Sequence, residues 1–152
     1  MAAPRVDFYV LPGSDDAARL RFACRLAEKA WLQRHRVRVQ FDPGGDLEAF
    51  DQMLWTFSDR SFVPHRRAGA PDDAPAPAPP PVVIADTAEG DPADGDFIIN
   101  LAAGVPPAFE DWTRVAEVVD SDPGRRQRGR ERFRAYRERG IEPATHEMRN
   151  ES

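Results

Sequence analysis

Hydrophobic residues gather in five short segments that are typical of β-strands. The segments are 5–10, 36–41, 82–86, 96–101 and 114–120. RVRVQF alternates apolar and polar positions, which is typical of a half-buried strand. VVIAD and DFIINL are almost continuously apolar, which favours central strands covered on both faces. The pattern therefore predicts a sheet whose middle strands are buried beneath helices.

Start and stop signals predict three helices between or after these strands. Ser14 is the expected N-cap of the first helix, and Asp46 begins the second. Asp122 followed by Pro123 begins a third helix, which Gly140 ends. Strands that alternate with helices predict an α/β fold with a mainly parallel, twisted sheet flanked by helices.

The chain is expected to form a single domain over residues 1–140. Its 152 residues suffice for one core but not for two ordinary domains. Residues 70–81 hold an Ala/Pro-rich stretch that suits neither helix nor strand, and they are expected to form an extended loop. Residues 141–152 are expected to be a loosely ordered tail.

Charge is distributed unevenly along the chain. The net charge is -5, yet residues 122–140 hold eight arginines and three acidic residues. The rest of the chain has 13 basic and 23 acidic residues, a net charge of -10. Such segregation of charge bears on the partners of the protein rather than on its fold. The acidic remainder of the chain disfavours non-specific binding along DNA, because it would be repelled by the phosphate backbone. No signal peptide or membrane-length apolar run is found, and Cys24 is the single cysteine, so a cytoplasmic location is expected.

The usual signatures of catalysis and cofactor binding are missing from the sequence. Neither G-x-x-x-x-G-K-[ST] nor G-x-G-x-x-G occurs, and Asp15 and Asp16 would repel a phosphate after the first strand. His35, His65 and His146 lack the spacing of metal ligands, and His65 is expected to bond the backbone in a loop. No catalytic site, cofactor or metal is predicted.

The third predicted helix presents arginines around an aromatic residue. At 100° per residue, one arc of about 100° holds Arg126, Arg130, Phe133, Arg134 and Arg137, with Gly129 and Tyr136 just beside it. This face suits a short acidic peptide with a hydrophobic residue. Two alternatives stay open: a solvated helix whose aromatic residues pack inward, and a direct grip on single-stranded nucleic acid.

A second aromatic cluster lies at the end of the second predicted helix. Trp55, Phe57, Phe62 and Val63 fall within nine positions. Such residues either cover the sheet or form a patch for a partner.

Several stretches together resemble the chi subunit family of bacterial DNA polymerase III. They are VDFYVL, CRLAEKAW, RVRV, LWTFSDRSFVPHRRAG, DFIINL and EVVDSDPGRRQRGRERFRAYRERG, in order over nearly all of residues 5–140. The resemblance implies a fold like that of nucleotide-binding domains, without phosphate-binding motifs. It also implies a noncatalytic DNA-replication accessory protein within a DNA-directed DNA polymerase complex. The rival hypotheses are a direct single-stranded nucleic-acid binder and a nucleotide-dependent enzyme.

The resemblance further implies two partners, and contact with DNA would be indirect. One is the acidic, Phe-terminated C-terminal tail of single-stranded DNA-binding protein, and the other is the psi subunit of the clamp loader, where present. The implied tail site comprises Arg126, Arg130, Phe133, Arg134, Tyr136 and Arg137. The implied psi contact comprises Trp55, Phe62, Val63, Pro64 and His65. Two departures are a Phe at 133, where related chains can have Tyr, and a longer, proline-rich segment after residue 65.

Overall fold

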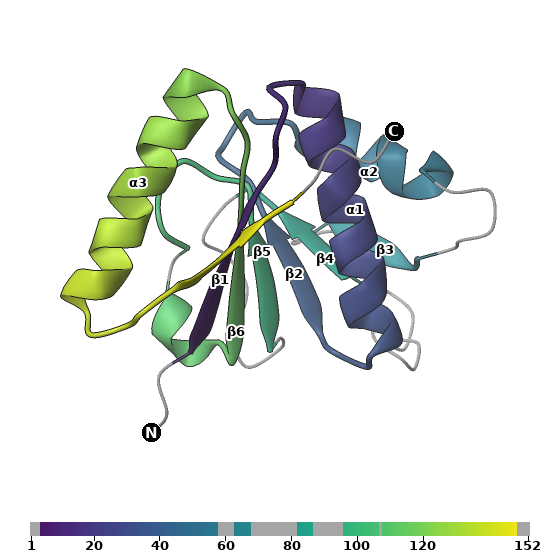
Figure 1. The fold of residues 1–152 in the computed structure, drawn as a ribbon. Helices are drawn as coiled ribbons and strands as arrows, with labels where there is room; N and C mark the ends of the chain where they lie inside the picture. The colour runs from purple at the N-terminus through teal and green to yellow at the C-terminus, as the bar shows by residue number, and fades with distance from the viewer. Residues whose placement is uncertain (1–3, 58–62, 68–81, 87–95, 107, 149–152) are drawn as a thin grey trace.

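A computed structural model describes residues 4–57, 63–67, 82–86, 96–106 and 108–148 (Figure 1). Its seven strands are β1 (Arg5–Val10), β2 (Val37–Gln40), β3 (His65–Arg67), β4 (Val82–Ala85), β5 (Phe97–Asn100), β6 (Arg114–Val119) and β7 (Ala144–Glu147). They form one sheet in the order β3-β4-β2-β5-β6-β1-β7, and each described pairing is parallel. The α/β fold with a parallel sheet is therefore confirmed.

Helices cover both faces of this sheet. They are α1 (Asp16–Leu32), α2 (Leu47–Thr56) and α3 (Pro123–Glu138). α1 and α2 lie on one side and α3 on the other (Figure 1). Ile99 belongs to the hydrophobic cluster beneath α1 and α2, whereas its neighbour Ile98 belongs to the cluster beneath α3. The continuous apolar pattern of β5 thus reflects a central strand that is buried on both faces.

Local signals set the helix ends, with one correction to the predicted caps. The N-cap of α1 is Asp15, whose carboxylate accepts a hydrogen bond from the backbone N–H of Ala17, rather than Ser14. Asp122 caps α3 by accepting from the backbone N–H of Arg125 at 2.9 Å. Gly140 follows α3 with a φ of +82°, which glycine adopts without the steric cost that a Cβ brings.

Residues 144–147 form a strand, which corrects the expectation of a loosely ordered tail from 141 onward. β7 pairs with β1 along its whole length, and the N–H of Met148 continues the ladder to the carbonyl of Val10. The Nε2 of His146 lies 2.9 Å from a carboxylate oxygen of buried Asp7. Backbone pairing and this polar contact hold the strand, so its sequence needs no strong apolar pattern.

We expect Asp7 to make stability depend on pH under acidic conditions. Burial raises the pKa of Asp7, but hydrogen bonds from His146 and Arg114 outweigh this and hold the pKa below its ordinary value. A carboxylate with a depressed folded pKa stabilises the protein above its unfolded pKa, about 3.9, and loses this effect as pH falls through the folded value. Asp7→Asn should cost about 1–3 kcal/mol near neutral pH, and this difference should shrink below about pH 4. Urea unfolding across this range tests it, and a constant difference would contradict it.

Candidate functional site

Helix α3 rests on the sheet through a narrow buried stripe. Gly129, Arg132 and Tyr136 are its buried residues. A Cβ at Gly129 would lie 3.0 Å from a methyl carbon of Val119, so glycine permits the close approach of helix and sheet. The residues on either side of this stripe are left at the surface.

A buried polar cluster fixes the helix against β5 and β6. Glu117 is fully buried and accepts hydrogen bonds from Arg132 Nε at 2.8 Å and from the Tyr136 hydroxyl at 2.6 Å. The amide of Asn100 donates to the same carboxylate at 3.0 Å. Burial raises the pKa of Glu117, although Arg132 and these hydrogen bonds oppose the shift. Sequence reasoning missed this cluster, whose one signal is a glutamate flanked by apolar residues in β6.

The position of Tyr136 requires a correction to the proposed tail site. Its side chain is 0% exposed, and its hydroxyl is bound to Glu117. Phe133 is half-buried, with its ring centroid 5.2 Å from that of Phe8. Tyr136 therefore supports the helix from below, whereas Phe133 still presents part of its ring to the surface.

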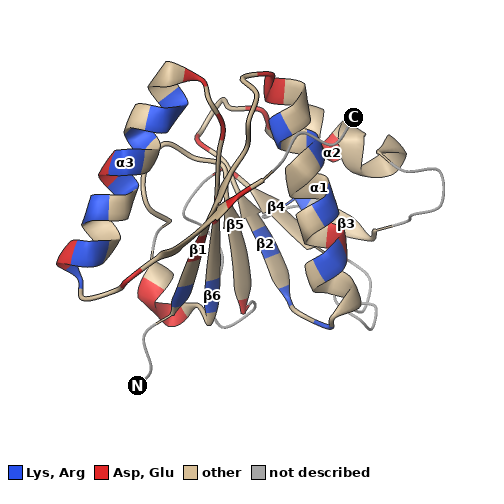
Figure 2. Cartoon of the chain, in the orientation of Figure 1, with Lys and Arg blue, Asp and Glu red and all other residues tan. Residues whose placement is uncertain are grey.

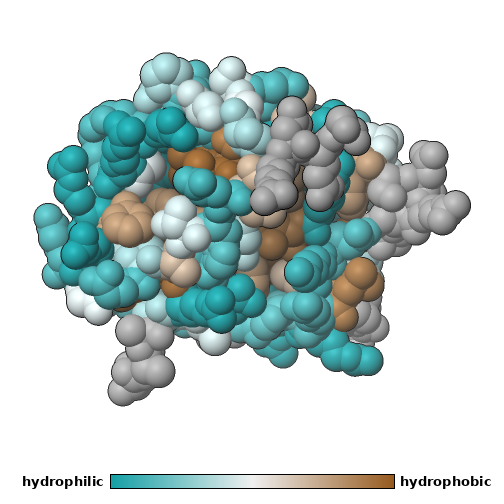
Figure 3. All heavy atoms as spheres, viewed as in Figure 1, coloured by the Kyte–Doolittle hydropathy of each residue, from teal (hydrophilic) through white to brown (hydrophobic). Residues whose placement is uncertain are grey.

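Beside Phe133 lies a cavity of about 270 Å³ between α3 and the edge of the sheet. It is lined by Phe8, Val10, Val119, Arg126, Gly129, Arg130, Phe133, Thr145 and Glu147. Apolar side chains of β1 and β6 contribute to the lining, and Thr145 and Glu147 of β7 bound one side. Figure 3 shows a hollow with hydrophobic atoms beside the hydrophilic surface of α3. The predicted residues Arg126, Arg130 and Phe133 thus share one cavity.

Several arginines around this cavity have no acidic partner in the part of the chain that the structure describes. Within the described residues, the side chains of Arg126, Arg130 and Arg134 form no hydrogen bond or ion pair, and all three are exposed. Arg137 lies 3.5 Å from Glu142, and both side chains are largely exposed. Figure 2 shows the basic residues as successive bands along α3. An apolar hollow with free guanidinium groups at its rim can bind a ligand that is both anionic and hydrophobic.

Comparison with known proteins identifies the family. The family model described as DNA polymerase III chi subunit, HolC, matches residues 3–144. The DNA polymerase III subunit chi of Pseudomonas aeruginosa is 40% identical over 144 residues, covering 95% of this chain and 96% of that protein. The chain belongs to the DNA polymerase III chi subunit family. The chi subunit of Haemophilus influenzae is 24% identical, and the match covers 94% of this chain and 96% of that protein. The chi subunit of Escherichia coli is 28% identical, and the match covers 80% of each chain.

Membership of the chi family makes the chain a replication accessory subunit, with the polymerase III holoenzyme as its assembly. Among the described residues, no group of three metal-ligating side chains is found. No helix in the described part of the chain is long and apolar enough to cross a membrane.

A second surface of this chi-family chain centres on Trp55. Its side chain is 54% exposed, and its ring lies 4.5 Å from the ring of His65. The Nδ1 of His65 lies 2.8 Å from the carbonyl of Val63, and its Nε2 lies 2.9 Å from a carboxylate oxygen of Asp51. His65 thus bonds the backbone as expected, but on strand β3 rather than in a loop. Val63 is buried in the core, Pro64 is half-buried, and Phe62 lies outside the described residues.

Proposed function

We propose that the cavity beside α3 binds the acidic, Phe-terminated C-terminal tail of single-stranded DNA-binding protein. The chain would thereby link the clamp loader and polymerase to coated single-stranded DNA, as a noncatalytic adaptor whose own contact with DNA is indirect. The observation that carries this proposal is the apolar cavity lined by Arg126 and Arg130, whose side chains form no ion pair within the described residues. The tail's two features, negative charge and a terminal aromatic ring, match the two parts of the site.

The expected mechanism is electrostatic attraction followed by burial of one ring. Arg126 and Arg130, with Arg134 and Arg137 further along the helix, would attract the acidic residues of the tail. Exposed ion pairs contribute only about 0–1 kcal/mol each, whereas burial of a Phe side chain contributes about 1.5–3 kcal/mol. The terminal ring would enter beside Phe133, and a guanidinium would hold the terminal carboxylate.

Direct binding of single-stranded nucleic acid fits the geometry less well. Base stacking needs a free aromatic face, but Phe133 is half-buried against Phe8 and Tyr136 is fully buried. The acidic body would also repel a long polynucleotide.

The affinity for the acidic tail is expected to fall steeply with salt. The attracting arginines are exposed, and the Debye length shrinks from about 30 Å at 0.01 M to about 3 Å at 1 M ionic strength. Fluorescence anisotropy with a labelled acidic peptide ending in Phe, titrated at several salt concentrations, should show at least a tenfold loss of affinity, about 1.4 kcal/mol. An affinity independent of salt would exclude electrostatic attraction as the first step.

We further propose that the surface around Trp55 contacts the psi subunit of the clamp loader. Trp55→Ala should weaken psi binding at least about tenfold, because exposed tryptophans often dominate an interface. Folding stability should change by less than about 1 kcal/mol, since the side chain is largely exposed. Leu32, which is 66% exposed, provides the matched control, and Leu32→Ala should leave psi binding intact. Equal affinities for the Trp55 and Leu32 variants in calorimetry would contradict the assignment.

A further inference from the structure

A second cavity, of about 210 Å³, lies on the other side of α3 from the proposed tail site. It opens at the carboxyl ends of β2, β5 and β6, where Phe41, Leu101 and Val118 contribute to its lining. The chain after β2 continues to α2 on one face of the sheet, whereas the chain after β6 continues to α3 on the other (Figure 1). Connections that diverge in this way leave a crevice at the carboxyl edge, the usual ligand position in open α/β sheets.

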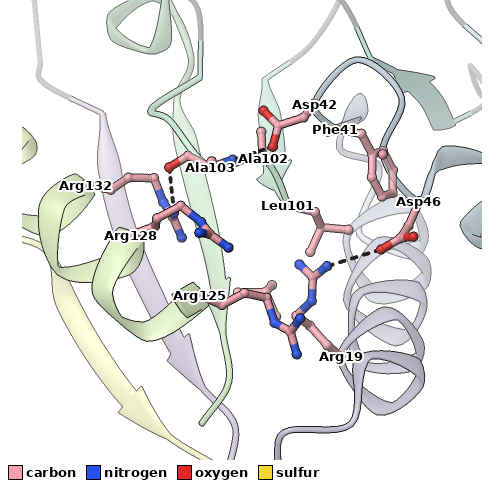
Figure 4. Close-up of a pocket in the computed structure, with 12 residues that line it drawn as sticks. Arg19, Phe41, Asp42, Asp46, Leu101, Ala102, Ala103, Arg125, Arg128 and Arg132 are labelled. Atoms are coloured by element: carbon pink, nitrogen blue, oxygen red, sulfur yellow. Dashed lines mark hydrogen bonds and ion pairs between the residues drawn. The ribbon is translucent and has the colours of Figure 1, made fainter. Parts of the chain in front are cut away.

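Four arginines from two helices line this cavity. They are Arg19 of α1 and Arg125, Arg128 and Arg132 of α3. Figure 4 shows the side chains of Arg19, Arg125 and Arg128 extending into the space between these helices. On α3 these positions lie on the opposite side from Arg126 and Arg130, so the helix presents two separate arginine faces.

Buried carboxylates fix the orientation of two of these guanidinium groups. Arg125 donates to Asp120 from Nε at 2.9 Å and from Nη2 at 2.7 Å. Arg132 donates from Nε to Glu117 at 2.8 Å and from Nη1 to the carbonyl of Ala103 at 2.9 Å. Arg125 also donates from Nη2 to the carbonyl of Ser14 at 3.2 Å, and its Nη1 lies 3.6 Å from Asp16, so fewer of its five N–H donors remain than in Arg132. Donors held in place lose little entropy on binding a ligand.

The other two arginines differ in their acidic partners within the described residues. Arg128 forms no side-chain hydrogen bond or ion pair within the described residues. Arg19 lies 2.9 Å from Asp16 and 3.7 Å from Asp46.

The remaining acid on the lining is already occupied by the backbone. Asp42 accepts a hydrogen bond from the N–H of Ala103 at 2.9 Å. The N-terminus of α1, the other common anion position in such folds, is capped by the carboxylate of Asp15. The N-terminus of α1 is therefore already occupied by a carboxylate of this chain.

We propose that this arginine-lined crevice binds a phosphate group. Fixed guanidinium forks match the oxygens of a phosphate, and the polar lining gives no apolar pocket for a hydrophobic peptide side chain. The proposed carrier of this group is a free nucleotide, because the acidic body of the chain disfavours a long polynucleotide. The site is independent of the tail site, because it uses the opposite face of α3.

Titration of the full-length ¹⁵N-labelled protein with inorganic phosphate, followed by NMR of the arginine Nε–H and backbone signals, tests this proposal. Saturable shifts at Arg128, Arg132 and Ala103 are expected by about 10 mM phosphate, ten times a Kd of 1 mM. A nucleoside monophosphate should bind more tightly than phosphate alone, whereas tighter binding of an oligothymidylate would contradict a free nucleotide as the carrier. Sodium chloride at equal ionic strength controls for screening.

The variant Arg128→Gln should weaken phosphate binding about tenfold, the loss expected for one charge-assisted hydrogen bond. Arg25→Gln removes an exposed arginine of α1 and should leave the affinity unchanged. The absence of saturable shifts, or an equal response in the Arg128 variant, would overturn the proposal. Phosphate should not change the affinity for the acidic peptide, because the two sites use different faces of α3. The proposal of a phosphate site and the proposal of a tail site can therefore be refuted independently.

Discussion

Replacing Glu117 with alanine is expected to lower the free energy of unfolding by about 3–5 kcal/mol. The substitution removes the buried acceptor of Arg132, Tyr136 and Asn100 at once and leaves a guanidinium in the interior without its carboxylate. Loss of one partner of a buried ion pair costs far more than loss of both, because the remaining charge is poorly solvated. Urea unfolding followed by circular dichroism measures the difference.

Two further variants separate the buried pair from a general effect of charge removal. Glu110→Ala breaks an exposed ion pair with Arg139 and should cost only about 0–1 kcal/mol. Glu117→Leu combined with Arg132→Leu should be less destabilising than the sum of the two single changes, because no unpaired charge remains. A loss below about 1 kcal/mol for Glu117→Ala would show that the cluster does not hold α3 in place.

Reversal of charge at Arg130 is expected to abolish binding of the acidic tail. Arg130→Glu places a carboxylate on the lining of the cavity, where Glu147 is already present, and like charges across an interface cost several kcal/mol. The affinity for the labelled peptide should fall more than about 100-fold, or about 2.8 kcal/mol. Anisotropy titration at low salt gives the comparison.

The matched control for this variant is Arg25→Glu on α1, which makes the same charge change at another exposed helical position. Its peptide affinity should stay within about twofold of the unaltered protein, a difference of about 0.4 kcal/mol. A similar loss in both variants would mean that net charge, rather than a local site, governs binding.

Much of the fold follows from local sequence signals. The continuous apolar runs of β4 and β5 predict buried central strands, and the Asp122 cap followed by Pro123 predicts the start of α3; the structure confirms these features. β3 and β7 were not predicted, because they are short edge strands with mainly polar residues. Their pairing depends on β4 and β1, which no local pattern reveals.

The candidate site could be predicted only in part. Helical spacing grouped Arg126, Arg130 and Phe133, which share one cavity, and their role in binding stays a prediction. Spacing gives the angle between residues but not which side faces the sheet. Arg132 and Tyr136 are buried because both side chains donate hydrogen bonds to Glu117. Glu117 lies on β6, so the pattern along α3 alone does not reveal that these two residues face the sheet.

Removal of the terminal Phe from the acidic peptide is the most direct test of the tail-binding account. The account predicts that the full protein binds the labelled peptide, loses most of that affinity when the Phe is deleted or when Arg130 is replaced by Ala, and does not bind a labelled oligonucleotide. Equal binding with and without the Phe, or binding of the oligonucleotide instead, would contradict the proposed tail site.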